Sequence, residues 1–286
     1  MVDLNLLKKI REDTGVSFSM CKKALEETNN NYDEAVKFLR KEGQAKAISR
    51  SDRAVSEGLC CILKDKTAVS CIKVGCETDF VSRNENFQKL VSLIAETALK
   101  TKSKSVDELL QQKVSDKTIK EIIIENISSI GENIVLSDVK TYELNPEENV
   151  HYYVHNSISG NRNIGRIVSF TISKGSDSEN ASLLLNQINM HIAAMSPIAL
   201  DEKSIPDSVV NNEKSIYEEQ VSKLNKPKEI EAKMIEGKLK KFYEENVLLK
   251  QTFVIDNKST VEEAILAFNK TNNSNIKLLS FTRFSI

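Results

Sequence analysis

Apolar residues recur with the 3.6-residue period of an amphipathic helix three times within residues 1–45. The members of the three stripes are Leu4, Leu7 and Ile10, then Cys21, Ala24 and Leu25, and finally Ala35, Phe38 and Leu39. Three short stripes in so few residues predict a small three-helix domain with a limited core of its own.

Polar residues and glycines mark the expected ends of these helices. Gly15 follows the first stripe and is a typical residue after a helix end. Ser17 or Ser19 is the candidate N-cap of the second helix, and Asn31 is that of the third. We expect Gly43 to end the third helix.

The pattern then changes to two short apolar runs, 59–63 and 68–74, on either side of a polar connection. This arrangement predicts a β-hairpin. A strong helical stripe follows, with a second helix at 116–130 and a long strand at 133–144. The members of the stripe are Phe87, Leu90, Val91, Ile94, Ala95 and Ala98. Together these elements predict an α+β subdomain at 57–145.

The same order of elements recurs further along the chain. A second hairpin is expected from 151–158 and 163–173, followed by an apolar helix at 181–195 and a closing strand at 275–286. We therefore predict a second, related α+β subdomain at 146–286, so that the fold class is α+β with an internal repeat.

Two narrow apolar stripes lie inside the second subdomain and are separated by a break at Pro227. Their members are Val210, Tyr217, Val221 and Leu224, then Ala232, Ile235, Leu239 and Phe242. Near-heptad spacing on both sides of a tight break predicts an antiparallel coiled-coil hairpin. We place this insertion at 203–228, with the second stripe following the break.

Composition fits an ordinary soluble protein. The 286 residues carry a net charge of −1, with 40% hydrophobic residues. This balance argues against a dedicated nucleic-acid binder. The basic residues 46–56 predict a linker that could extend the third helix, and a solvated helix end is preferred there over an RNA contact. No secretory signal or membrane span is visible, so a cytoplasmic protein is expected.

Residues that carry chemistry do not form a recognisable catalytic set. The five cysteines are odd in number and lack paired ligand spacing, so a zinc site on Cys60, Cys71 and Cys76 is disfavoured. His191 falls inside an apolar helix, where a core or interface histidine is preferred over a metal ligand. No phosphate-binding glycine motif is present. We expect no cofactor and no metal, and an enzyme is the weaker class.

The stretch from Cys76 to Gln88 places an aromatic residue at a strand-to-helix connection. The spacing from Ser82 to Glu85 matches an S-x-x-E capping box, which would make Val81 the residue before the cap. Phe80 lies further out on the connection. Periodicity leaves open whether Phe80 is a core residue or an exposed interface anchor.

This stretch, "CETDFVSRNENF", resembles the T-D-F-V signature of the elongation factor Ts family, whose members exchange guanine nucleotides on elongation factor Tu. Further segments resemble family motifs in the family's order, and the resemblance covers nearly the whole chain. These segments are "IREDTGVSFSMCKKALEE", "IGENIVL", "NMHIAAMSP", "KPKEIEAKMIEGKLKKF" and "TFVIDNKSTVEEAI".

The resemblance implies a ubiquitin-associated-like N-terminal domain, a core of two subdomains and a coiled-coil protrusion. It also implies that the partner is elongation factor Tu bound to GDP, that Phe80 inserts near the partner's Mg²⁺ site, and that Asp79 disturbs the network around the ion. The residues implied as partner contacts are Thr78, Asp79, Phe80 and Val81 at the corner, Phe18, Met20, Cys21 and Lys22 in the N-terminal domain, and His155, His191 and Ile235 in the core.

The sequence departs from the family pattern at three places. Phe18 and Ser19 replace the apolar pair that the family commonly presents to its partner. The tip of the second hairpin around His155 is longer, and the C-terminal module of many relatives is expected to be absent. An alternative of another class is an adaptor in which residues 1–45 bind some other helix and the core is a passive scaffold.

Overall fold

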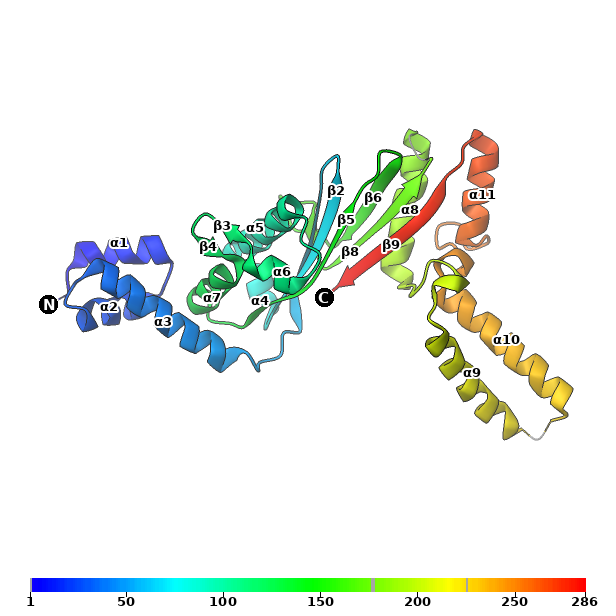
Figure 1. Cartoon of the computed structure of the whole chain (residues 1–286), viewed down its shortest axis with the longest axis horizontal. Coiled ribbons are helices and arrows are strands. Elements are labelled where there is room, and N and C mark those ends of the chain that lie inside the picture. The colour runs from blue at the N-terminus through cyan, green and yellow to red at the C-terminus, as the bar shows by residue number, and fades with distance from the viewer. Residues whose placement is uncertain (1, 176–177, 225) are drawn as a thin grey trace. The chain divides into compact units, whose positions relative to one another are not determined.

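The computed structural model describes residues 2–175, 178–224 and 226–286, which form two compact units (Figure 1). Unit 1 consists of Met1–Leu144, Asn156–Val168 and Phe284–Ile286, and unit 2 of Asn145–His155 and Ser169–Arg283. The chain mixes helices with antiparallel sheet, so the predicted α+β class is confirmed.

Unit 1 begins with three helices, α1 (Leu4–Thr14), α2 (Phe18–Glu27) and α3 (Tyr32–Arg50). Their buried stripes form one apolar cluster, whose members include Ile10 and Leu25. The predicted helix signals at three positions are correct. They are Gly15 in the left-handed conformation with φ 64°, Ser17 at the N-cap position of α2 but without a side-chain capping bond, and Asn31, whose side chain accepts from the Glu34 amide.

The third helix is longer than the sequence indicated. It continues through Gly43 to Arg50, so the first residues of the predicted linker are helical. Gly43 is buried against α7 (Ile119–Ile130), where a Cβ atom would lie 3.4 Å from the Cβ atom of Ser128. The glycine therefore serves close helix packing and does not end the helix.

A four-stranded sheet forms the centre of unit 1, in the order β5-β2-β1-β7. The predicted hairpin is present as β1 (Glu57–Lys64) and β2 (Ala68–Cys76), which pair antiparallel, and β5 (Ile134–Glu143) pairs antiparallel with β2. Helices α5 (Glu85–Thr101) and α7 contribute buried residues to the same core as the sheet. Short elements complete the unit: α4 (Asp79–Ser82), α6 (Val106–Gln111), β3 (Lys113–Val114) and β4 (Lys117–Thr118).

Strand β7 (Ile164–Gly165) corrects one predicted boundary. Residues 156–168 were expected in the second subdomain, but Ile164 and Gly165 pair with Cys61 and Cys60 of β1. This segment therefore belongs to unit 1.

Unit 2 contains a three-stranded sheet in the order β6-β8-β9. Its strands are β6 (Glu148–His155), β8 (Ile167–Lys174) and β9 (Lys277–Ser285), and α8 (Glu179–Met195) and α11 (Val261–Asn272) share one apolar core. In both units the late strand lies beside the second strand of the hairpin. Beyond this shared strand order, the internal repeat of two related subdomains stays a prediction.

The helical hairpin of unit 2 consists of α9 (Asp207–Ser222) and α10 (Lys228–Asn246). The predicted insertion at 203–228 covered only α9 and the connection, because its limit was set at the break, before the second helix. Two residues of these helices, Val221 and Phe242, are buried. Short 3₁₀ helices at Glu202–Ser204 and Leu248–Lys250 flank the pair. In the described part of the chain, no helix has both the length and the apolar character to cross a membrane.

Candidate functional site: an exposed corner between a strand and a helix

The connection between β2 and α5 is a short helical turn. Thr78 has extended backbone angles and caps α4, and its hydroxyl accepts from the Val81 amide at 3.4 Å. Residues 79–82 then form α4, so Asp79 and Phe80 occupy the first turn of a helix. The corner is regular structure and not an irregular loop.

The predicted capping box at Ser82 and Glu85 is wrong. Ser82 is the last residue of α4, is buried, and donates to the Asp79 carbonyl at 2.8 Å. The N-cap of α5 is Asn84, whose side chain accepts from the amides of Asn86 at 2.8 Å and Phe87 at 3.4 Å. The extra turn of helix upstream moves the cap two residues along the chain.

Phe80 and Val81 have opposite environments although they are adjacent. Phe80 is 79% exposed, whereas Val81 is 8% exposed and belongs to the same core cluster as Phe87. The alternatives that periodicity left open are therefore separated: Val81 anchors the corner in the core, and Phe80 points away from it. A large aromatic side chain without a packing role in its own chain is a typical interface anchor.

Asp79 is also at the surface. Its carboxylate lies 3.0 Å from the Arg83 guanidinium, one helical turn away. An exposed pair of this kind contributes little to stability. A partner can therefore compete for the Asp79 carboxylate at small cost.

The position of the corner depends on Glu132, a residue that was not among the predicted contacts. Its Oε2 atom accepts from the amides of Glu77 at 3.1 Å and Thr78 at 3.0 Å, and its Oε1 atom accepts from the Thr78 hydroxyl at 2.6 Å. The signal that could have found Glu132 is the segment "IGENIVL", in which Gly131 ends α7 with φ 96° and Glu132 follows.

Beneath the corner lies the thiol of Cys76, which donates to the Thr78 carbonyl at 3.2 Å. Burial, with a smaller contribution from the Glu132 carboxylate, raises the pKa of Cys76 to about 12. The thiol is therefore protonated and packs as a small apolar group.

The predicted contacts of the N-terminal domain differ in accessibility. Phe18 is 52% exposed and lines a shallow hollow with Leu4 and Leu7. Lys22 is exposed, and Met20 is half-buried. Cys21 is fully buried in the cluster of the three helices, so the structure does not place its side chain where a partner could touch it. These four residues lie in a different part of unit 1 from α4.

The predicted contacts of unit 2 also differ. His155 is exposed at the end of β6, and Ile235 is half-buried on α10. His191 is fully buried, so its predicted direct contact with a partner is not available in this structure. Its ring bonds to Gln251 at 2.9 Å and accepts from the Val254 amide at 3.3 Å, which makes it a structural residue.

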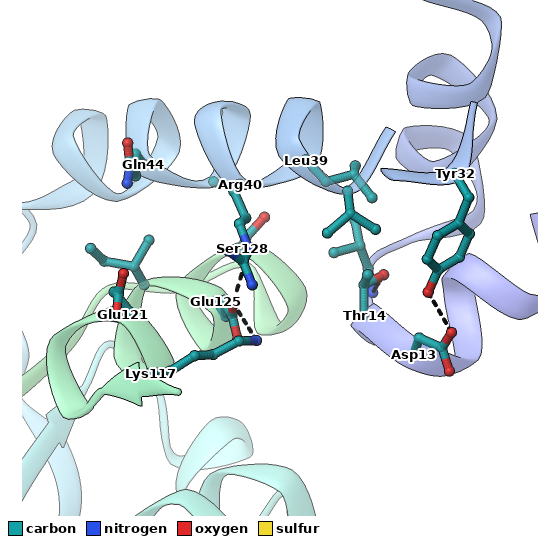
Figure 2. Close-up of a pocket in the computed structure, with 14 residues that line it drawn as sticks. Asp13, Thr14, Tyr32, Leu39, Arg40, Gln44, Lys117, Glu121, Glu125 and Ser128 are labelled. Carbon is teal, nitrogen blue, oxygen red and sulfur yellow. Dashed lines mark hydrogen bonds and ion pairs between the residues drawn. The ribbon is translucent and has the colours of Figure 1, made fainter. Parts of the chain in front are cut away.

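A cavity of about 170 Å³ lies between α3 and α7 (Figure 2). Its charged groups are largely paired: Lys117 lies 2.7 Å from Glu125, Arg40 is 4.0 Å from the same carboxylate, and the Tyr32 hydroxyl donates to Asp13. Lys117 and Arg40 offset the charge of Glu125, and Asp13 is held by a hydrogen bond, so these groups are engaged in bonds within the chain.

Comparisons with known proteins identify the family of the chain. The sequence profile described as Elongation factor TS matches residues 77–286, which include the corner. The chain is 38% identical over 281 residues to Elongation factor Ts of Rickettsia rickettsii (strain Sheila Smith), which covers 98% of this chain and 90% of that protein. The identity is 37% over 284 residues to Elongation factor Ts of Rhodospirillum centenum, with coverage of 98% and 91%.

The matches define the chain as a translation elongation factor, acting in protein biosynthesis. It belongs to the elongation factor Ts family. The family resemblance inferred from the sequence motifs is thereby confirmed.

Proposed function

We propose that the chain is a guanine-nucleotide exchange factor that binds elongation factor Tu in its GDP-bound form and promotes GDP release, so that GTP can bind. The observation that carries this proposal is the exposed Phe80 on a hydrogen-bonded helical corner. Membership of the elongation factor Ts family supports elongation factor Tu as the partner.

An exchange factor must bind the nucleotide-free partner more tightly than the GDP-bound partner, because equal affinity for both would shift no equilibrium. Much of the affinity for GDP comes from Mg²⁺ and the phosphate-binding backbone. Phe80 enters an apolar pocket near the Mg²⁺ site, and Asp79 disturbs the waters and side chains around the ion. Phe80 and Asp79 therefore both act at the site that contributes most to the partner's affinity for GDP.

Phe80 cannot supply the whole effect. Burying one phenylalanine contributes about 1.5–3 kcal/mol, which is at most about a hundredfold in affinity. The three-helix domain, through Phe18 and Lys22, and unit 2, through His155 and Ile235, supply further contacts that position the corner. The coupling between factor and nucleotide is reciprocal, so GDP also weakens binding of the factor.

The test is stopped-flow release of fluorescent GDP from elongation factor Tu. Phe80→Ala is expected to slow stimulated release by about ten- to a hundredfold, because the variant loses apolar burial only in the complex. The fold should be unaffected, since Phe80 is exposed.

Leu266→Ala is the matched control, because Leu266 is also a large exposed apolar residue but lies on α11. This variant should release GDP at the rate of the unaltered protein. A folded Phe80→Ala protein with an unchanged release rate would show that Phe80 does not act in exchange.

A further inference from the structure

The four residues of α4 are too few to form a stable helix on their own. Phe80 has little contact with its own chain, so the direction of its side chain depends on the backbone of residues 77–80. Whatever fixes this backbone therefore fixes where Phe80 points. The groups that do so come from outside the corner.

Glu132 holds the entry to α4 with both carboxylate oxygens. One oxygen accepts two successive backbone amides, those of Glu77 and Thr78, and the other accepts the Thr78 hydroxyl. Hydrogen bonds to an ionised acceptor are about twice as strong as neutral ones. Because two amides and one hydroxyl bind the same half-buried carboxylate, the backbone at the Thr78 cap is held in a single conformation.

Hydrogen bonds between residues 77–78 and residues 132–133 run in both directions. The Glu77 carboxylate accepts from the Asn133 amide at 2.7 Å, so residues 77–78 and 132–133 exchange side-chain-to-backbone bonds. Asn133 is buried, and its side-chain amide donates to the Arg53 carbonyl at 2.9 Å. Arg53 in turn lies 3.5 Å from Glu77. The corner is thus joined to the segment that follows α3.

We propose that Glu132 is a positioning residue for exchange: it holds the Thr78 cap so that Phe80 enters the complex without first having to be ordered. This inference rests on the function proposed above. Pre-ordering of a contact residue removes an entropic cost that would otherwise be subtracted from binding. In this role Glu132 acts through the corner, by way of its bonds to Glu77 and Thr78.

The experiment measures stimulated GDP release for four proteins: the unaltered chain, Glu132→Ala, Phe80→Ala and the double variant. Glu132→Ala is expected to slow release by about tenfold, because two backbone amides and a hydroxyl lose their shared acceptor. In the Phe80→Ala background the same change should cost less than about twofold, because a side chain that is absent cannot be misdirected.

Two further variants separate positioning from general damage. Glu132→Gln keeps an oxygen for the two amides and should retain release within about threefold of the unaltered rate. Glu263→Ala removes a carboxylate that likewise accepts a backbone amide, that of Thr260 at 2.8 Å, but in the cap of α11. It should leave release unchanged. Hydrogen exchange of the Glu77 and Thr78 amides should rise in Glu132→Ala and not in Glu263→Ala.

The outcomes are distinguishable. If Phe80→Ala leaves release unchanged, the proposed function of the corner fails. If Phe80→Ala slows release but the Glu132→Ala effect is equally large in both backgrounds, Glu132 acts by general stability and the positioning role is overturned. Unchanged release by a folded Glu132→Ala protein would overturn it as well.

Discussion

The imidazole of His191 is held from two sides inside unit 2. Nδ1 accepts from the Val254 amide at 3.3 Å, so the proton of the neutral ring must lie on Nε2, which donates to Gln251 Oε1 at 2.9 Å. The Gln251 amide donates in turn to the Glu245 carbonyl at 2.7 Å. A charged ring would lose the bond from Val254, because both of its nitrogens would then be donors.

The pH dependence of stability follows from this arrangement. Burial lowers the pKa of His191 below its ordinary value, and the Gln251 bond opposes the shift only in part. The unfolded chain therefore binds the proton first as pH falls. We expect the contribution of His191 to the free energy of unfolding to be complete above about pH 6.5. Below that pH the free energy of unfolding should decrease by at most about 1.4 kcal/mol per pH unit.

Urea titrations at several pH values measure this effect. His191→Gln should be destabilised at pH 7.5 and should have a flatter profile between pH 6.5 and 5. Leu266→Ala, which alters an exposed residue of the same unit, should keep the profile of the unaltered protein. Parallel profiles for His191→Gln and the unaltered protein would contradict the assignment.

The corner shows how far residue patterns predict a site. The T-D-F-V motif predicted which residues stand at the corner, but periodicity left the environment of Phe80 open. The S-x-x-E spacing at Ser82 predicted a cap that the chain does not use, because Thr78 and Asn84 cap two helices in its place. Glu132 approaches from 54 positions away. No local pattern contains that contact.

At the scale of elements, the packing of α3 on α7 depends on one residue without a side chain. Gly43 sits against Ser128, and Arg50 at the end of α3 donates to the Ile127 carbonyl at 3.0 Å. A Cβ atom at Gly43 would make an ordinary contact with Ser128, so alanine fits there. We expect a much longer side chain to be too large for this contact. A small and a large substitution at Gly43 should therefore change the stability of the protein in opposite directions.

We expect Gly43→Ala to stabilise the protein by up to about 1 kcal/mol, through better helix propensity. Gly43→Leu should destabilise it by about 1–3 kcal/mol, because the side chain forces α3 away from α7. Urea unfolding measures both changes, and protease cleavage within residues 51–56 should increase only for leucine. Equal stability of the two variants would show that the helices do not depend on this contact.

Glycines illustrate why helix ends are only partly predictable. Gly15 and Gly131 each follow a helix and adopt the left-handed conformation. A glycine after an apolar stripe usually indicates such a helix end. Gly43 gave the same signal but lies inside α3. The difference arises from α7, whose approach the sequence of α3 does not contain.

At the scale of the whole molecule, the α9–α10 hairpin has a small core of its own. One residue of each helix is buried, Val221 and Phe242, and the cluster around Phe242 lies with residues such as Ala199 and Val247 at the ends of the pair. Regions with few buried apolar contacts open locally at low free energy. The distal part of the hairpin should therefore open without unfolding of unit 2.

Hydrogen exchange with mass spectrometry tests this expectation. Peptides from 212–222 and 228–238 should exchange at least about a hundredfold faster than peptides from α8, which carries many buried residues. Val221→Ala should accelerate exchange in the hairpin and leave α8 unchanged. Equal protection of α8 and the hairpin would mean that the hairpin unfolds only with the whole unit.

The strand order also limited what the sequence could predict. Hairpins and late strands were predictable because their signals are local. The membership of β7 in the first sheet was not, because pairing with Cys60 and Cys61 joins residues about 100 positions apart, and local periodicity does not specify the partner of a strand.

That strand order has a consequence for how the protein is made. β5 follows β2 after roughly 60 residues, whereas β9 follows β8 only after roughly 100. On a growing chain, three strands of the first sheet can therefore assemble while the outer partner of β8 has not yet been synthesised, and β8 keeps an unpaired edge throughout that interval. The time for which this edge of β8 stays unpaired depends on the rate of translation elongation, which is the process in which this elongation factor acts.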